Sequence, residues 1–550
     1  MSFQLENFAD PTLDGDYLTY LVDQHSPDVA ERYQRLWDYF RNPLYPAIGP
    51  AAEALNAASR PYVQAQEMGL PPRITGRPGA QHLIDLRRKE VVIENDIAWR
   101  VHTAVDFLFG KPPVIRSLAA DRRTAVLIER IIDALLEANG GVGFLQEMAL
   151  FGSVYGFVDI ALRTPADGSA VVSPASVHPA GQPANGHHPT AEAGRPGTPG
   201  TSPSPEPTID TLPPAGPTDP AIRRQLAQAV AVAAGVQLET IEAARILPIL
   251  HEDDYRRLRY WAQRYHKHPP RMDSVRRGWL GLGAVRGGQP AVVEVIEVLG
   301  ETWWQRYEDR VLVAEGPNVL RRLPIVHVQN TALPGSYEGL GEVEPLIALQ
   351  DELNTRLSDR ANRVTYQSFK MYLGKGIDDF LERPVGPGQM WSTSNLQASI
   401  EEFGTDSGSP SEDAHIEQVR QALDKVSAVT PLAAGLVRGN VGYLTSATAL
   451  KVLLSGLLAR TAKKRITYGA GIARIVELAL EYLDAVGVFR TSVDDRRIEI
   501  HWPSPLPDNE AEGLRNAQTK VALGVPADTV LGELGYAPDK AHNDLPTGKD

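Results

Sequence analysis

Residues 445–486 predict a single very long helix, and this element constrains the fold more than any other part of the sequence. A glycine-rich loop, residues 430–444, leads into it, and Ser446 is well placed to cap its N-terminus. A continuous helix of this length spans roughly 60 Å, which suits a protein that lines a channel better than most soluble enzymes. We expect a kink at Gly469 and Gly471, near its middle. The apolar face repeats at helical spacing through Leu450, Leu453, Leu454, Leu457 and Leu458.

Composition excludes several classes of protein. The chain has 550 residues, enough for more than one structural region, and a formal net charge of -13. Proteins that grip nucleic acid over a broad surface are usually basic, so any contact with nucleic acid should be local or sliding. The absence of cysteine excludes disulfides, cysteine zinc sites and thiol catalysis. The first ten residues do not form a signal peptide pattern, and no apolar run reaches the roughly 18–20 residues that span a bilayer. We expect a soluble cytosolic protein without a membrane partner.

Residues 1–163 predict a helical region that ends in a strand. One helix places aromatic residues on a single face, and a second has an apolar stripe between Ile93 and Leu108, with Gly110 as its stop signal. Two more helices are predicted at residues 126–136 and 144–150, and the alternation in residues 155–162 predicts a strand. The aromatic face of the first helix consists of Tyr33, Leu36, Trp37 and Phe40.

The composition changes abruptly at residues 164–220, where Pro, Gly, Ala, Ser and Thr dominate. Such a segment cannot offset its ordering entropy by burial, so we expect a disordered insertion. His187 and His188 lie in it, and an adventitious pair is a better interpretation than a metal site. Residues 221–342 then predict a β-rich region with six strands. Trp303 and Trp304 are either part of the sheet core, which we favour, or a platform for stacking bases.

Two further helices, residues 343–367 and 412–429, flank a small insert at residues 368–411 that is rich in Gly and Pro. Each helix has one apolar seam at helical spacing. A strand at residues 496–502 follows the longest helix, and two short helices over residues 508–550 close the chain. Together these patterns predict an α+β fold. The seams consist of Leu346, Leu349, Leu353, Leu357, Ala361 and Val364 in the first helix, and Ile416, Val419, Leu423 and Val426 in the second.

No catalytic, metal or cofactor motif stands out in the sequence. A phosphate-binding loop, a zinc-protease helix, a nucleophile elbow and a calcium loop are all missing. The glycines near Gly281 resemble a dinucleotide loop, but Arg286 occupies the third glycine position. Carboxylates at Asp351, Glu352 and Asp359 could be read as acid–base groups. Their spacing with Arg356, Arg360 and Arg363 fits i,i+4 surface or inter-subunit ion pairs better. We therefore predict that the protein is not an enzyme and holds no cofactor or metal.

Several phrases, in this order, make the chain resemble the portal protein of tailed bacteriophages, specifically the portal family of long-tailed siphophages. The departures are the tract at 164–220 and the short C-terminal region. The phrases lie at residues 93–96, 105–113, 151–158, 323–330, 339–354, 357–362, 445–451 and 503–512.

The resemblance implies a portal-type fold with named parts. Residues 343–367 and 412–429 would be stem helices that pack in a ring, and residues 368–411 a small α/β clip. Residues 430–444 would be the tunnel loop, and residues 445–507 the long kinked helix with a wing strand. Residues 1–163 and 221–342 would form the wing, and residues 508–550 a reduced helical crown.

The resemblance also implies a function. Portal proteins form a homo-oligomeric ring of about a dozen subunits at one capsid vertex. Double-stranded DNA is packaged and ejected through the ring, which docks the packaging motor (the large terminase) and the head-tail adaptor. Major capsid and scaffolding proteins are further expected partners. The expected location is the virion, after assembly in the host cytoplasm.

Candidate site residues follow from these parts. In the tunnel loop they are Leu436, Val437, Arg438 and Asn440, of which Arg438 has the only charge. Arg438 would either touch DNA phosphates lightly or pair with a carboxylate of the neighbouring subunit. In the clip, Trp391 and Phe403 would contact partners or, equally, fill a small clip core.

Two other functions remain open at the level of sequence. One is a phage-encoded head-maturation enzyme, a protease or nuclease, which would need a nucleophile or metal constellation. The other is a monomeric scaffold that binds protein partners through the Pro-rich tract. Both would be small in solution, whereas a ring would be very large.

Overall fold

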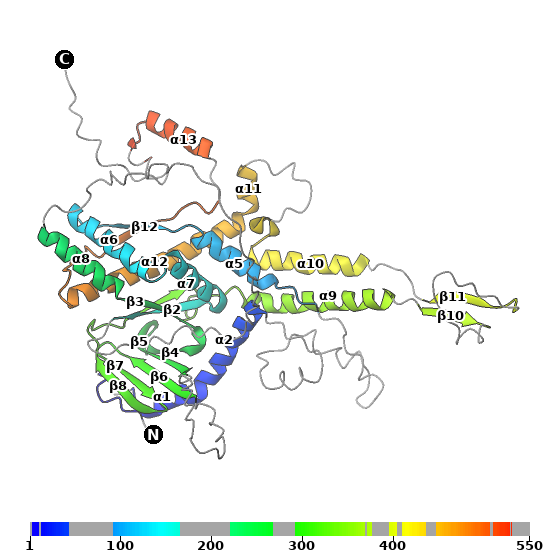
Figure 1. Ribbon diagram of the computed structural model, residues 1–550, viewed down its shortest axis with the longest axis horizontal. Helices are drawn as coiled ribbons and strands as arrows, with labels where there is room; N and C mark the ends of the chain where they lie inside the picture. The colour runs from blue at the N-terminus through cyan, green and yellow to red at the C-terminus, as the bar shows by residue number, and fades with distance from the viewer. Residues whose placement is uncertain are drawn as a thin grey trace, which may run out of the picture. The chain divides into compact units, whose positions relative to one another are not determined.

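The computed structural model describes residues 3–9, 13–42, 92–164, 220–267, 292–368, 371–376, 395–403, 410–435, 447–506, 510–527 and 530. The fold is α+β, as the sequence predicts (Figure 1). The chain divides into two compact units. Unit 1 consists of Met1–Asp38, Arg116–Gly341 and Tyr468–Glu499, and unit 2 of Tyr39–Ile115, Glu342–Thr467 and Ile500–Asp550.

Unit 1 contains a five-stranded antiparallel sheet in which sequence neighbours pair in order. Its alternating sequences give each strand one face toward the core. Register shifts interrupt the β4–β5 and β7–β8 pairs. The strands are β4 (Ile246–His251), β5 (Asp254–Lys267), β6 (Val293–Leu299), β7 (Trp303–Glu308) and β8 (Val311–Pro317).

The N-terminal segment covers one face of this sheet. Apolar residues from Phe3 to Val22, including those of α1 (Gly15–Tyr20) and a π-helical turn (Leu21–His25), are buried against strand residues such as Ile296 and Tyr307. Trp303 packs against the same core and donates its Nε1–H to Glu315 at 3.3 Å. Its position agrees with the sheet-core interpretation rather than with a base-stacking platform.

A second sheet of unit 1 has the order β3-β2-β9. The central strand β2 (Phe157–Arg163) is almost wholly buried and pairs antiparallel with β3 (Gln237–Ile241) and β9 (Ile325–Gln329). α7 (Val142–Tyr155) leads into β2 through Gly156, whose φ of 94° is in the left-handed region that glycine adopts without strain. α6 (Arg122–Ala138) contacts α8 (Pro220–Ala234).

A buried carboxylate, Asp159 of β2, joins the two sheets of unit 1. It accepts hydrogen bonds from the indole of Trp261 in β5 at 2.8 Å and from the hydroxyl of Tyr337 at 2.8 Å. The imidazole Nδ1 of His327 lies 2.7 Å from its other oxygen. Burial and this carboxylate raise the pKa of the Tyr337 phenol. The contacts with these three side chains replace the hydrogen bonds that the Asp159 carboxylate would make with water.

The predicted long helix is two helices. α11 (Ala447–Leu453) and α12 (Ser455–Ala485) are separated at Leu454. The boundary at Leu454 was not predicted. α12 is helical through Gly469 and Gly471, so the kink expected at these glycines stays a prediction. Gly471 serves close packing: a Cβ atom there would collide with Val328 of β9.

Unit 2 contains the two predicted stem helices. α9 (Ile347–Ser368) follows a 3-10 turn at Glu344–Leu346, and α10 (Pro410–Ser427) runs beside it (Figure 1). Between them in sequence, β10 (Met371–Lys375) and β11 (Ser399–Phe403) form an antiparallel hairpin. Unit 2 also includes α5 (Asp96–Phe109), the end of α2 (Ser26–Arg41), α11, the first part of α12, and α13 (Glu510–Ala522).

β1 (Val114–Ser117) and β12 (Ile498–His501) pair in a two-stranded sheet. Among the described residues, no helix is long and apolar enough to cross a membrane. The predicted disordered insertion lies outside the described residues, apart from its first and last positions.

Candidate functional site

An apolar seam joins α9 to α10 within one chain. Leu346 and Leu353 are 1% and 0% exposed, and Ile416, Val419 and Leu423 of α10 are equally well buried. Leu346 and Leu353 are seven residues apart, and the three residues of α10 are spaced by three and four. Each set therefore lies on one side of its helix, and the two sides face each other. Leu349 and Leu357 are half-buried, and Val364 is 52% exposed. The seam is thus closed near the start of α9 and more open toward its end.

A second face of α9 binds an extended segment of the chain through polar side chains. Gln350, Asn354 and Ser358 are spaced four residues apart and are 3% exposed or less. They accept the backbone N–H groups of Asp96, Glu94 and Val92 at 3.1, 2.9 and 2.9 Å. Gln350 also donates to the carbonyl of Glu94 at 2.6 Å. This stripe fixes the entry to α5 against α9.

A row of ion pairs links the distal parts of α9 and α10. Arg360 pairs with Asp413 at 2.9 Å, Arg363 pairs with Glu412, and His415 lies 3.0 Å from Glu352. Ion pairs were predicted for the charges of α9, and the structure confirms them, although some cross to α10 instead of staying within one helix. They are partly exposed and therefore screened by salt.

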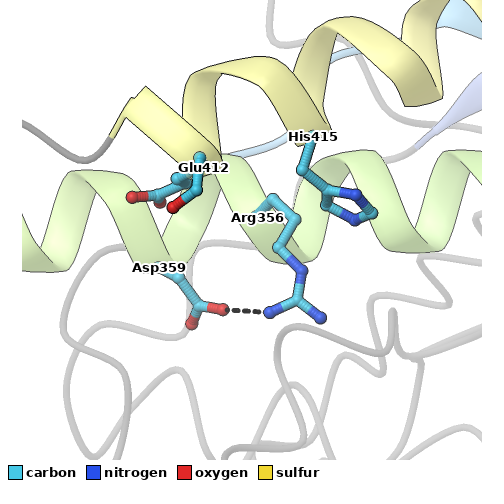
Figure 2. Close-up of a pocket in the computed structure, with 5 residues that line it drawn as sticks. Arg356, Asp359, Glu412 and His415 are labelled. Atoms are coloured by element: carbon cyan, nitrogen blue, oxygen red, sulfur yellow. Dashed lines mark hydrogen bonds and ion pairs between the residues drawn. The ribbon is translucent and has the colours of Figure 1, made fainter.

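A shallow pocket opens beside these ion pairs (Figure 2). It is lined by Arg356, Asp359, Ser411, Glu412 and His415 and has a volume of about 350 Å³. Arg356 bonds Asp359 at 3.3 Å and Glu352 at 2.7 Å, so its charge is already shared. Burial alone would raise the pKa of the Glu352 carboxyl, but hydrogen bonds from Arg356 and His415 outweigh it and lower that pKa. The described residues hold no cluster that could bind a metal ion.

The β10–β11 hairpin occupies the predicted clip. Phe403 is the last residue of β11 and pairs with Met371 of β10. Gly376, with φ of 66°, follows β10, and its carbonyl accepts from Asn395 at 3.2 Å. The neighbouring Leu396 is fully exposed. Trp391 lies outside the described residues.

The segment after α10 begins the predicted tunnel loop. A 3-10 turn at Pro431–Ala434 ends at Gly435, whose φ is 78°. Arg100 of α5 holds the end of α10 through hydrogen bonds to Ser427 and Val429. Leu436, Val437, Arg438 and Asn440 lie outside the described residues.

Sequence reasoning missed Arg100 and the polar stripe on α9. Arg100 sits in an apolar helix and is only 3% exposed, so a charge there was a possible signal. The regular four-residue spacing of Gln350, Asn354 and Ser358 was another, but polar residues at that spacing are also typical of a solvated helix face.

Residues 297–537 match the family model described as phage portal protein, SPP1 Gp6-like. No curated protein matches the chain. A chain of the solved structure titled "Virion of native gene transfer agent (GTA) particle" is 11% identical, with a TM-score of 0.39, over 80% of this chain and 90% of that chain. A chain of "Neck of empty GTA particle computed with C6 symmetry" is 11% identical, with a TM-score of 0.41, over 81% and 91%.

The matched segment contains α9, the hairpin, α10 and α12, so these elements lie in the part of the chain that is similar to phage portal proteins. Over residues 297–537 the chain is similar to the SPP1 Gp6-like portal family. This result confirms the resemblance inferred from the sequence phrases.

Proposed function

We propose that this protein forms a homo-oligomeric ring at one vertex of a phage capsid, through which double-stranded DNA is packaged and ejected. The observation that carries the proposal is the family match over residues 297–537, because it includes both helices of the α9–α10 pair and the hairpin between them. In this assignment α9 and α10 are the stem and β10–β11 belongs to the clip. The residues before 164 and between 221 and 342 are the wing, and residues 508–550 are a reduced crown.

Ring packing would use the part of the α9 seam that one chain leaves uncovered. Leu346, Leu353 and Leu423 are buried inside a single chain. Leu349, Leu357 and Val364 retain exposed surface. A heterologous interface that closes into a ring places such a surface against a different face of the next subunit. Loss of apolar contact there should weaken the ring and leave the subunit folded.

Residues 430–444 would line the channel. Arg438 is the only charged residue in this loop, so a ring would carry one cationic collar there. We propose a light contact with DNA phosphates, since an isolated exposed contact is screened at cellular salt and would not stall a moving strand. If Arg438→Ala changes packaged DNA length or retention without changing the melting temperature of the ring, the DNA contact holds. A lower melting temperature with normal DNA length indicates an inter-subunit ion pair instead.

The hairpin and its surroundings, residues 368–411, would dock the large terminase during packaging and the head-tail adaptor afterwards. Capsid and scaffolding proteins would surround the ring in the virion, after assembly in the host cytoplasm. The overall negative charge, -13 per chain, would repel DNA from most surfaces of such a ring and favour sliding.

Light scattering of purified protein tests the ring directly. We expect a particle many times the mass of one chain. Val364→Asp should lower the ring fraction about tenfold because it introduces a charge into an apolar interface. The matched variant Leu353→Ala removes a side chain that is 0% exposed within the chain, so it should lower subunit stability instead. A folded wild-type monomer at micromolar concentration would contradict the proposal.

A further inference from the structure

Arg100 makes an unusual set of contacts for a residue in the middle of a helix. Its side chain is 3% exposed, and its Nη1 donates to the Ser427 hydroxyl at 3.0 Å and to the Val429 carbonyl at 2.5 Å. Its Nη2 lies 2.7 Å from Asp424 and 3.4 Å from Asp96. The guanidinium plane also covers the Trp99 ring at 4.4 Å. One side chain therefore binds the last turn of α10 and Val429, the second residue after the helix.

The end of α10 needs such a partner. The last carbonyls of a helix lack partners within the helix, and cations near them are favourable. Ala428 follows α10 with a φ of 55°, a left-handed conformation that costs energy for a residue with a Cβ. Ser427 closes the turn by accepting from the N–H of Val429 at 3.1 Å. A second arginine, Arg460 of α12, donates to the carbonyl of Val426 at 2.5 Å.

The chain after this turn stays close to the helix that carries Arg100. The 3-10 turn Pro431–Ala434 contacts α5. The bonds of Arg100 thus fix both the direction in which the chain leaves α10 and the surface on which Thr430–Gly435 rests. A lysine could not reproduce this arrangement, because an ammonium lacks the planar fork that binds a carbonyl and a carboxylate together.

We propose that Arg100 is a positioning residue for Thr430–Gly435, the described start of the loop assigned above to the channel. Each subunit would then present this segment at the same angle, which a ring needs for an even opening. The even opening of the ring rests on the proposed function, whereas the anchoring of Thr430–Gly435 by Arg100 concerns a single chain.

The absence of cysteine makes a direct test possible, since one introduced cysteine takes a spin label uniquely. Ala434→Cys places the label on the exposed end of the 3-10 turn, and Gln418→Cys places it on the exposed face of α10. Three backgrounds are compared by electron paramagnetic resonance: wild type, Arg100→Lys, and Arg100→Met combined with Asp424→Asn. The double variant avoids an unpaired carboxylate beside the lost cation.

Arg420→Met is the matched control. Arg420 also ties α10 to the segment before α5, through Glu94 at 2.7 Å, but it binds no group at the end of α10. We expect both Arg100 backgrounds to raise the ratio of mobile to immobile label at position 434 about tenfold, as the loss of a charge-assisted hydrogen bond implies. The label at position 418 should not change in either background, and Arg420→Met should change neither label.

An unchanged spectrum at position 434 in the folded Arg100 variants would overturn the proposal. Mobility that rises equally at 418 and 434, or equally in Arg420→Met, would overturn it too, because it would indicate a general loosening of α10. If wild-type protein forms no ring, the ring function fails, yet the label comparison still decides whether Arg100 anchors the segment.

Discussion

Gly471 of α12 lies against Val328 of β9 so closely that a Cβ atom at position 471 would collide with the valine Cγ2. Both residues belong to unit 1. Gly471→Ala should therefore lower the free energy of unfolding by about 1–2 kcal/mol: overpacking costs 1–3 kcal/mol, and the better helix propensity of alanine returns part of it. Chemical denaturation followed by circular dichroism measures the change.

The partner residue supplies the control for this prediction. Val328→Ala removes the colliding methyl groups, so Gly471→Ala should be harmless in that background even though Val328→Ala itself costs stability through a cavity. Equal effects of Gly471→Ala in both backgrounds would contradict the packing explanation and favour a helix-bending role for the glycine.

The lowered pKa of Glu297 indicates how the stability of unit 1 depends on pH. Burial would raise the pKa of its carboxyl, but Arg163 at 2.9 Å and Gln263 at 2.6 Å outweigh burial, and the net shift is downward. The folded pKa is thus below the unfolded one. The ionised carboxylate stabilises the fold above the unfolded pKa of about 4.3, and this contribution is lost as the pH falls through the folded pKa.

Glu297→Gln should consequently cost about 1–3 kcal/mol at pH 7 and make the remaining stability less sensitive to acid. Denaturant melts at several pH values from 7 down to about 2 measure both effects, because the loss falls below the unfolded pKa. The exposed Glu301, in the turn between β6 and β7, gives a control, and Glu301→Gln should leave the pH profile unchanged. A parallel acid loss in wild type and Glu297→Gln would show that other groups govern it.

The clip prediction concerns Trp391 and Phe403. If these two side chains anchor a partner, their alanine variants should assemble into rings but attach tails poorly, since aromatic residues dominate interface hot spots. If they fill a core of the clip, the same variants should melt at a lower temperature and assemble poorly. Ring yield by light scattering and tail attachment by electron microscopy separate the two outcomes, and normal tails on normal rings would remove both residues from the docking site.

Strands and long helices could be predicted from the sequence because the apolar residues of each element repeat with a single period. Alternation identified β4 to β9 within a few residues, and the seam from Leu346 to Leu357 identified α9. α8 and β3 were missed. The buried face of α8 consists of small residues, Ala229 and Ala233, which give a weak apolar stripe next to a Pro-rich tract.

Features set by distant contacts could not be read from the sequence. The boundary between α11 and α12 lies at Leu454, although leucine is a good helix former, so the local sequence did not indicate it. Arg100 and the stripe at Gln350, Asn354 and Ser358 act through residues more than 250 positions away along the chain. Such pairs depend on the assembled fold, and local spacing does not encode them.

Electron microscopy of the purified protein shows whether the subunits assemble into a ring. We expect closed rings with a central channel, in which α9 and α10 of each subunit surround the axis and the segment after α10 faces the opening. Folded particles of single-chain size, or rings whose channel is lined by other elements, would contradict it.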